Sequence, residues 1–172
     1  MNEDQPQAAR LNEIEPQPSK AKAGRFWQCF WLSFLVVSLG YAWYSFYAPS
    51  NRIAWSASYA AAQEEAAELD KPVLLFFTGK WCSPCQIMKR QVWADEQVMA
   101  AVNGLFVPVA IDVDDPDAAS SLSRYSIAST PTTIITDSRG NVLHYEQGRM
   151  SKAGFLELLD ELDPSTFEGL KR

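Results

Sequence analysis

The sequence predicts an α/β domain, folded as a three-layer sandwich around a mixed central sheet and preceded by one transmembrane helix. Three observations lead to this prediction. No charged residue occurs at positions 26–51. Two short, continuously apolar runs, at 73–77 and 105–113, are separated by stretches of helical character, as expected for buried strands joined through helices. Two further runs, at 132–136 and 142–147, flank a turn of polar and small residues, which is typical of an antiparallel hairpin.

The uncharged segment has the length and the aromatic pattern of a membrane span. Residues 26–48 would form a helix about 34 Å long at about 1.5 Å per residue, enough for a hydrocarbon core of about 30 Å. Aromatic residues lie at both ends, with a plainer apolar centre from Leu32 to Leu39. A buried core helix would seldom lack every charge. A cleaved signal peptide would need a shorter apolar core and a small-residue cleavage site. We therefore predict a transmembrane helix over 26–48.

The charges on either side of this span predict its direction. Four basic residues precede it within residues 1–25, whereas Arg52 is the basic residue that closely follows it. An excess of Lys and Arg marks the cytoplasmic side. We therefore expect a single-pass protein of the cell inner membrane, with its carboxy-terminal domain in the periplasm. The predicted parts are a disordered, proline-containing cytoplasmic tail at 1–25, the span, a linker at 49–53, and a folded domain at 54–172.

Composition excludes several classes of function for this chain of 172 residues. Residues 53–172 carry seventeen Asp or Glu against ten Lys or Arg. Because phosphate binding needs clustered basic residues, we expect no nucleic-acid partner. Three cysteines are too few for a small protein stapled by disulfides. The length suits one compact domain with appendages.

Helices and strands are expected to alternate through most of the domain. Alanine-rich composition and polar caps predict the helices, because Ser and Asp side chains accept hydrogen bonds from the free amide groups of a first turn. Strands joined through helices should be parallel, and the closing hairpin antiparallel. The expected elements are a helix at 54–70 with Ser56 or Ser58 as cap, a strand at 73–77, a helix opening at 81–85, a helix from Asp95 to about Val102, a strand at 105–113, a helix at 118–125, strands at 132–136 and 142–147, and a final helix capped by Ser151.

Two cysteines follow directly after the first predicted strand, in the segment Cys82-Ser83-Pro84-Cys85. Cys82 would lie at the amino terminus of a helix, where free amide groups and the helix dipole favour a thiolate. Cys85 would lie one turn further into the helix, within disulfide reach and shielded. A thiolate at Cys82 that forms a mixed disulfide could then be resolved by Cys85.

The segment at 81–85, Trp-Cys-Ser-Pro-Cys, resembles the WCxxC motif of the thioredoxin superfamily. The segment Thr130-Pro131-Thr132, placed before a strand, resembles the cis-proline loop of that family. Residues from Trp55 to Phe76 and from Asp95 to Val98 are similar to the subgroup that includes the carboxy-terminal domain of DsbD-type thiol:disulfide interchange proteins. The resemblance covers about residues 54–163 and implies a thioredoxin-like fold.

From this resemblance, Cys82 would be the nucleophile and Cys85 the resolving thiol. Trp81, Thr130 and Pro131 would bind substrate, with Pro131 at the substrate backbone and preceded by a cis peptide bond. The implied activity is thiol:disulfide exchange in other proteins, without a cofactor.

The chain also departs from the family pattern. Thioredoxins carry a buried acid six residues before the first motif cysteine, where this chain has Phe76, and Ser83 replaces a common glycine. In thioredoxins that acid helps to take the proton of the resolving thiol. Its absence from this chain puts fast reductase turnover in question. We also expect no metal site, because zinc needs about four ligands and the motif supplies two.

We therefore expect a membrane-tethered protein that exchanges thiols and disulfides in extracytoplasmic proteins through Cys82 and Cys85. The seven residues between Tyr47 and Trp55 reach at most about 25 Å, so its partners should be proteins at the membrane, with a membrane electron donor as a further candidate. The direction of electron flow is open. The alternative is a redox-silent, thioredoxin-like accessory subunit of a membrane complex.

Overall fold

The computed structural model describes residues 20–47 and 49–162 of the chain. Two compact units divide between Tyr41 and Ala42. The predicted disordered tail lies outside the described residues as far as residue 19. Residues 20–25, which the sequence analysis also placed in that tail, are helical.

The first unit contains most of helix α1, Lys20–Phe46. The helix begins six residues before the predicted span, because the alternating Lys and Ala residues at 20–23 are strong helix formers. Its segment Gly24–Ser45 has a mean hydropathy of 1.3 and is long and apolar enough to cross a membrane. Every residue from Gly24 to Tyr44 is exposed, so none of the described residues buries this apolar surface.

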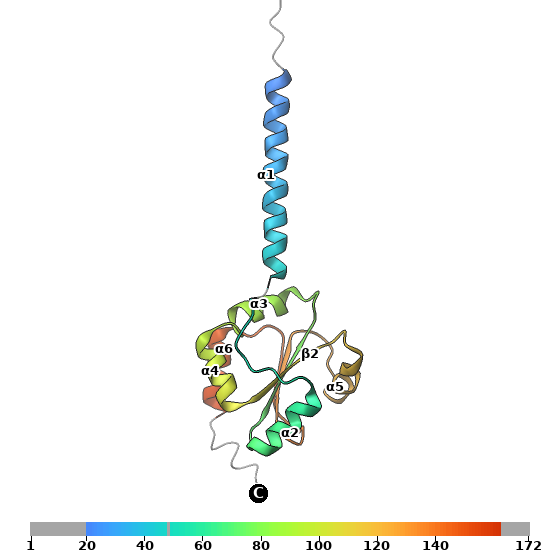
Figure 1. Ribbon diagram of the computed structural model, residues 1–172, viewed down its shortest axis with the longest axis vertical. Coiled ribbons are helices and arrows are strands. Elements are labelled where there is room, and N and C mark those ends of the chain that lie inside the picture. The colour runs from blue at the N-terminus through green and yellow to red at the C-terminus, as the bar shows by residue number, and fades with distance from the viewer. Residues whose placement is uncertain (1–19, 48, 163–172) are drawn as a thin grey trace, which may run out of the picture. The chain divides into compact units, whose positions relative to one another are not determined.

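Within the described residues, the second unit is built on a mixed sheet with the strand order β2-β1-β3-β4. Figure 1 shows this sheet with helices around it. The strand bounds are β1 Val73–Thr78, β2 Val107–Asp112, β3 Thr132–Thr136 and β4 Val142–Gln147. β1 pairs in parallel with β2 and antiparallel with β3, and β3 pairs antiparallel with β4. The parallel pair joined through helices and the antiparallel hairpin were both predicted, and both are confirmed.

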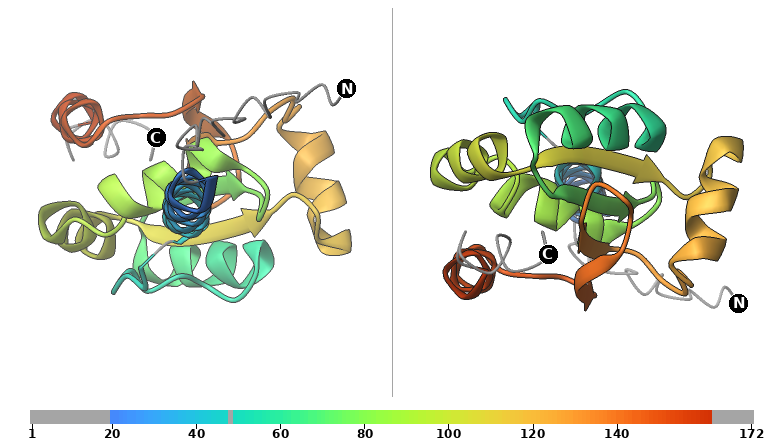
Figure 2. Two further views of the ribbon diagram at one scale, coloured as in Figure 1. Left: turned by 90° about the horizontal axis from the view of Figure 1, so that it is seen from above. Right: turned by 90° about the horizontal axis from the view of Figure 1, so that it is seen from below.

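Helices cover the two faces of the sheet. Figure 2 shows α2 on one side of strand β2 and α3 on the other. Helices α3, α4 and α6 pack on one face, whereas α2 and α5 pack on the opposite face. The predicted three-layer sandwich is therefore confirmed. The bounds are α2 Tyr59–Leu69, α3 Ser83–Gln91, α4 Glu96–Leu105, the short 3₁₀ helix η1 Pro116–Ala118, α5 Ala119–Arg124 and α6 Lys152–Glu161.

Most element boundaries agree with the sequence, and the exceptions are β2 and the start of α2. Ser58, Asp95 and Ser151 cap α2, α4 and α6 by accepting backbone amide hydrogen bonds. β2 is shorter than predicted, because α4 continues to Leu105. It is also an edge strand with Ala110 exposed, so the prediction of a strand buried along its whole length is wrong.

The segment before α2 is bound to the domain. The Arg52 amide donates to Met99 Sδ at 3.1 Å, and the Ser56 amide donates to the Pro108 carbonyl oxygen at 2.8 Å along the edge of β2. These bonds hold the segment extended, so α2 begins at Tyr59, five residues later than predicted. They also attach the second half of the predicted linker to the domain.

An aromatic cluster of Trp55, Phe76, Trp93 and Phe155 lies between the sheet and helices α4 and α6. The ring centroid of Trp93 is 5.3 Å from that of Phe76 and 5.1 Å from that of Phe155. Edge-to-face pairs of this kind add to the stabilisation from burying large rings. Cys82 and Cys85 belong to the same core cluster, so the cysteine pair packs directly against the apolar core.

Candidate active site

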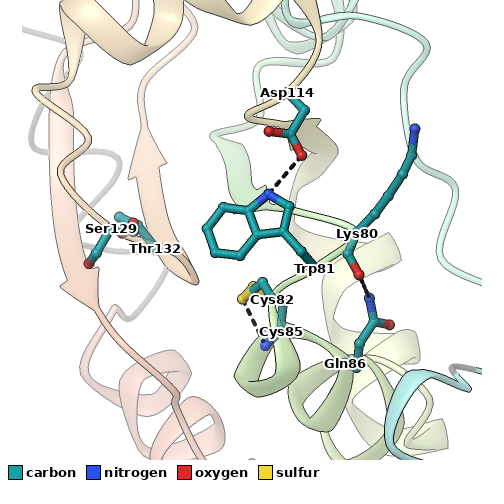
Figure 3. The surroundings of a disulfide bond; sticks show 8 residues. All are labelled: Lys80, Trp81, Cys82, Cys85, Gln86, Asp114, Ser129 and Thr132. Atoms are coloured by element: carbon teal, nitrogen blue, oxygen red, sulfur yellow. Dashed lines mark hydrogen bonds between the residues drawn. A yellow bond between two sulfur atoms is a disulfide. The ribbon is translucent and has the colours of Figure 1, made fainter. Parts of the chain in front are cut away.

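Strand β1 and helix α3 place the cysteine pair at one end of the sheet. β1 ends at Thr78 and α3 begins at Ser83, so Cys82 is the amino-terminal cap of α3. Pro84 lies in the first turn, where its missing amide has no helical partner. A disulfide joins Cys82 to Cys85 (Figure 3).

The two cysteines differ in their helical position more than in their exposure. In the disulfide form Cys82 is 2% exposed and Cys85 is 0% exposed. The Cys85 amide donates to Cys82 Sγ at 3.2 Å. Free amide groups and the helix dipole at this end stabilise negative charge on Cys82 Sγ once the disulfide is reduced. The geometry therefore favours Cys82 over Cys85 as the thiolate.

Trp81 lies beside the disulfide, and an acid from another loop holds its indole ring. Indole Nε1 donates to Asp114 Oδ2 at 2.8 Å, although the residue is 64% exposed (Figure 3). A Cβ at Gly79 would approach the indole Cε2 to 3.2 Å, so glycine lets the ring lie close to the backbone. From sequence, Asp114 is one of four acids at 112–117 that are typical of a solvated loop after a strand, and nothing local indicates its contact with a residue 33 positions away.

The loop before β3 lies at the same end of the sheet as the cysteines. The Thr130–Pro131 peptide bond is cis, which confirms the prediction. Thr132 pairs in register with Phe77 of β1, and Figure 3 places Ser129 and Thr132 across from Trp81. The structure thus brings Trp81, Thr130 and Pro131 to the end of the sheet that carries the cysteine pair, as the resemblance implied.

Hydrogen bonds from β3 and from the end of β4 fix this loop. Thr132 Oγ1 donates to the Ser129 carbonyl oxygen at 2.8 Å. Gln147 Nε2 donates to Ser129 Oγ at 2.6 Å, and the amide of Gly148 donates to the Pro131 carbonyl oxygen at 2.8 Å. Ser129 and Gln147 were missed by the sequence analysis, because single polar residues in a loop and at a strand end carry no functional signal.

Beneath the cysteines, the position of the acid that thioredoxins carry holds an aromatic ring. Phe76 is 1% exposed and packs against Trp93. A phenyl ring can neither donate nor accept a proton, so Phe76 has no part in proton transfer at Cys85.

Charged side chains lie at the same end of the sheet, near α3. Asp112 ends β2 in register with Thr78, and Lys80 Nζ lies 3.9 Å from Asp112 Oδ2. Burial lowers the pKa of the half-buried Lys89 below its ordinary value, and the negative charge of Asp112 opposes that shift. The sequence analysis did not single out Lys89, because its burial arises from tertiary packing.

Among residues 20–47 and 49–162, no group of three or more His, Cys, Asp or Glu side chains is placed to hold a metal ion. The remaining cysteine, Cys29, is an exposed free thiol in α1. The Cys82–Cys85 disulfide gives the described geometry a pair suited to redox chemistry.

Comparison with known proteins places this fold and site in a family. A sequence model of the family described as thioredoxin-like matches residues 54–138. A thioredoxin-like protein of Synechocystis is 32% identical over 101 residues, which are 59% of this chain and 90% of that protein. The chain belongs to the thioredoxin-like family.

Similarity to DsbD proteins narrows this assignment. The thiol:disulfide interchange protein DsbD of Ralstonia nicotianae is 33% identical over 81 residues, which are 46% of this chain and 13% of DsbD. The crystal structure of the oxidised DsbD carboxy-terminal domain of Neisseria meningitidis matches with a TM-score of 0.50 and 25% identity, covering 59% of this chain and 90% of that domain. The predicted resemblance to that domain is confirmed, and the match covers only a small part of the full-length DsbD.

Proposed function

We propose that the chain is a membrane-tethered thiol:disulfide oxidoreductase that acts on extracytoplasmic proteins through Cys82 and Cys85. One observation carries the proposal: the cysteine pair caps helix α3 at the end of the sheet where the Thr130–Pro131 loop lies. That arrangement supplies a stabilised thiolate, a resolving thiol one turn away, and an adjacent loop for substrate. The similarity to DsbD proteins supports it.

The proposed reaction moves two electrons between the cysteine pair and a protein disulfide. In the reducing direction, the Cys82 thiolate attacks the substrate disulfide, and one substrate sulfur leaves as a thiolate. Cys85 then attacks Cys82 Sγ, which forms the Cys82–Cys85 disulfide and releases the second substrate sulfur. The reverse steps oxidise a substrate dithiol. Trp81, Thr130 and Pro131 are proposed to bind the substrate chain beside the reacting sulfurs.

Helix α1 is proposed to anchor this domain in the cell inner membrane. Apolar residues such as Val37 and Trp43 are 69% and 76% exposed, and the described protein offers nothing to cover them. The helical segment Gly24–Ser45 has 22 residues and a mean hydropathy of 1.3, and this length matches the thickness of a bilayer core. The four basic residues before the uncharged segment, three of which lie in the first turns of α1, support a cytoplasmic amino terminus and a periplasmic domain.

The proposed partners follow from this tether. Substrate proteins would present thiols or disulfides at the membrane surface, and a membrane electron donor would re-reduce the Cys82–Cys85 pair if the protein works as a reductase. Apocytochromes are one class of substrate handled at that surface.

Activity of the full-length chain in detergent tests the proposal. Reduced wild type should reduce a protein disulfide such as that of insulin, or its oxidised form should oxidise a reduced protein, and Cys82→Ser should abolish both activities. The alternative is a redox-silent accessory subunit. It is supported by Phe76, which occupies the position where thioredoxins carry a buried acid. It predicts that wild type and Cys82→Ser are equally inactive in both assays.

The reduction potential of the Cys82–Cys85 pair would then show in which direction electrons flow between the pair and its substrates. A value of about −270 mV is expected for a reductase, and one of about −120 mV for an oxidase.

A further inference from the structure

The second step of the proposed reaction poses an electrostatic problem at Cys85. To attack Cys82 Sγ, the Cys85 thiol must become a thiolate. Cys85 is 0% exposed and belongs to an apolar core cluster that includes Phe76 and Trp93. Such surroundings disfavour a charged sulfur and raise the pKa of a buried thiol. A nearby positive charge would counteract this effect.

Lys89 is placed to supply that charge. It follows Cys85 by four residues in α3, Ser83–Gln91. Side chains at this spacing lie on the same face of a helix, with about 5–6 Å between their Cβ atoms. On this face Cys85 is fully buried, and Lys89, one turn further along, is half-buried.

Asp112 supports the charged form of Lys89 from the neighbouring strand. Asp112 ends β2, and its side chain is 18% exposed. It pairs in register with Thr78, four residues before Cys82. Burial works against the Lys89 ammonium group, and the negative charge of Asp112 works in its favour. Lys80, which also lies near Asp112, extends into solvent with its side chain 85% exposed.

Other charged side chains around α3 have partners of their own. Arg90 donates to the carbonyl oxygens of Tyr44, Ser45 and Tyr47 at 2.6 to 3.2 Å. Asp114 accepts the Trp81 indole hydrogen bond, Lys152 pairs with Asp95 at 2.8 Å, and Arg52 pairs with Glu96 at 3.1 Å. Of the charged groups described around the site, Lys89 is therefore the cation suited to act on Cys85.

We propose that Lys89 stabilises the Cys85 thiolate through its positive charge and so controls the resolving step; this inference rests on the proposed function. Cys85 loses its proton to solvent, and its sulfur attacks Cys82 Sγ. The Cys82–Cys85 bond forms, the bond between Cys82 and the substrate breaks, and the substrate sulfur leaves with the electron pair as a thiolate. The cysteine pair is oxidised by two electrons and the substrate is reduced. Lys89 acts through its charge as a positioning residue.

Single-turnover kinetics with the aromatic disulfide dithiobis(nitrobenzoate) separate the two steps. The full-length chain would be used in detergent, reduced, with Cys29→Ser to remove the third thiol. Attack by Cys82 releases a first nitrothiobenzoate, and attack by Cys85 releases a second. In Lys89→Met, we expect the second release to slow about tenfold at neutral pH and its pH midpoint to rise by about one unit. The first release should change far less.

Two controls separate charge from packing. Lys89→Arg keeps the charge and should restore the wild-type pH midpoint. Lys80→Met removes a charge near the same Asp112 but from an exposed side chain, so it should shift the midpoint of the second release much less than Lys89→Met does. An unchanged second release in both Lys89→Met and Lys89→Gln would overturn the inference, as would a Lys89→Arg variant that is as slow as Lys89→Met. Absence of the first release in wild type would instead contradict the proposed function itself.

Discussion

At the residue scale, the two cysteines of the disulfide lie in different surroundings. Cys82 caps helix α3, and its Sγ accepts a hydrogen bond from the Cys85 amide. Cys85 lies inside the helix and has apolar neighbours. Once the bond is reduced, the same helix that stabilises charge on Cys82 shields Cys85. We propose that this asymmetry gives each sulfur a distinct role in exchange.

This asymmetry predicts which thiol reacts first. In the reduced protein at neutral pH, alkylation should modify Cys82 before Cys85, because the thiolate is the reactive form. The Cys85→Ser variant should then accumulate mixed disulfides with partner proteins, since the intermediate cannot be resolved. Mass spectrometry of modified peptides would measure the order of labelling. Preferential labelling of Cys85 would contradict the assignment.

The Trp81–Asp114 hydrogen bond gives a second prediction at this scale. Asp114→Ala removes the acceptor that holds the exposed indole over the site, so the rate of exchange with a protein disulfide should fall several-fold. Stability should change by less than about 0.5 kcal/mol, because Asp114 is exposed. Asp114→Asn retains an acceptor oxygen and should recover most of the rate. Asp115→Ala, an exposed neighbour, is the matched control, and an equal loss of rate there would rule out a specific role for Asp114.

At the scale of elements, the turn between β3 and β4 fixes the far end of the sheet. Gly140 has φ +84°, and the Asp137 side chain accepts the amide hydrogen bonds of Arg139 and Asn141. Arg124 Nη2 donates to the Arg139 carbonyl oxygen at 3.0 Å. β3 runs from the Pro131 loop to this turn. The turn, which we expect to stabilise the domain, therefore lies at the opposite end of β3 from the candidate active site.

Gly140→Ala should therefore destabilise the domain without slowing its chemistry. A Cβ there would lie 2.5 Å from Arg124 Nη2 and 2.7 Å from Tyr59 Oη, in a backbone conformation that alanine disfavours. We expect a loss of about 1–3 kcal/mol of unfolding free energy, measured by denaturant titration, with the exchange rate of the folded protein unchanged. Gly104→Ala, in helix α4 with nothing within 4 Å of the added Cβ, should be neutral or stabilising. A loss at Gly104 as large as at Gly140 would contradict this explanation.

Sequence patterns predicted the helices and strands more accurately than they predicted the tertiary contacts between those elements. β3 and β4 have the predicted bounds because β-branched residues and a polar turn specify them locally. The start of α2 was misplaced, because the bond from Ser56 to Pro108 is tertiary. In the site, local spacing indicated the cysteines, and the family resemblance indicated Pro131. Asp114 and Lys89 depend on which residues the folded sheet brings together, and no local pattern encodes that.

At the scale of the whole chain, the proposed membrane tether reaches the domain through a short connection. The domain is bound to its own amino-terminal segment from Arg52 onward, so the free part of the predicted linker is shorter than the sequence alone indicated. With the proposed membrane anchor, a short connection would raise the effective concentration of the site for partners at the membrane and lower it for distant ones.

Lengthening the connection should therefore change which proteins the site meets. An insertion of about 20 Gly and Ser residues between Pro49 and Ser50 would add a mean span of about 25 Å. In the Cys85→Ser background in intact membranes, we expect mixed disulfides with membrane proteins to form several-fold more slowly, and the share with soluble proteins to rise. The same Gly and Ser segment appended to the carboxy terminus controls for added mass, and purified variants should reduce a soluble protein disulfide equally fast. If the insertion left both the identity of the trapped proteins and their rate of capture unchanged, the tether would have no role in choosing substrates.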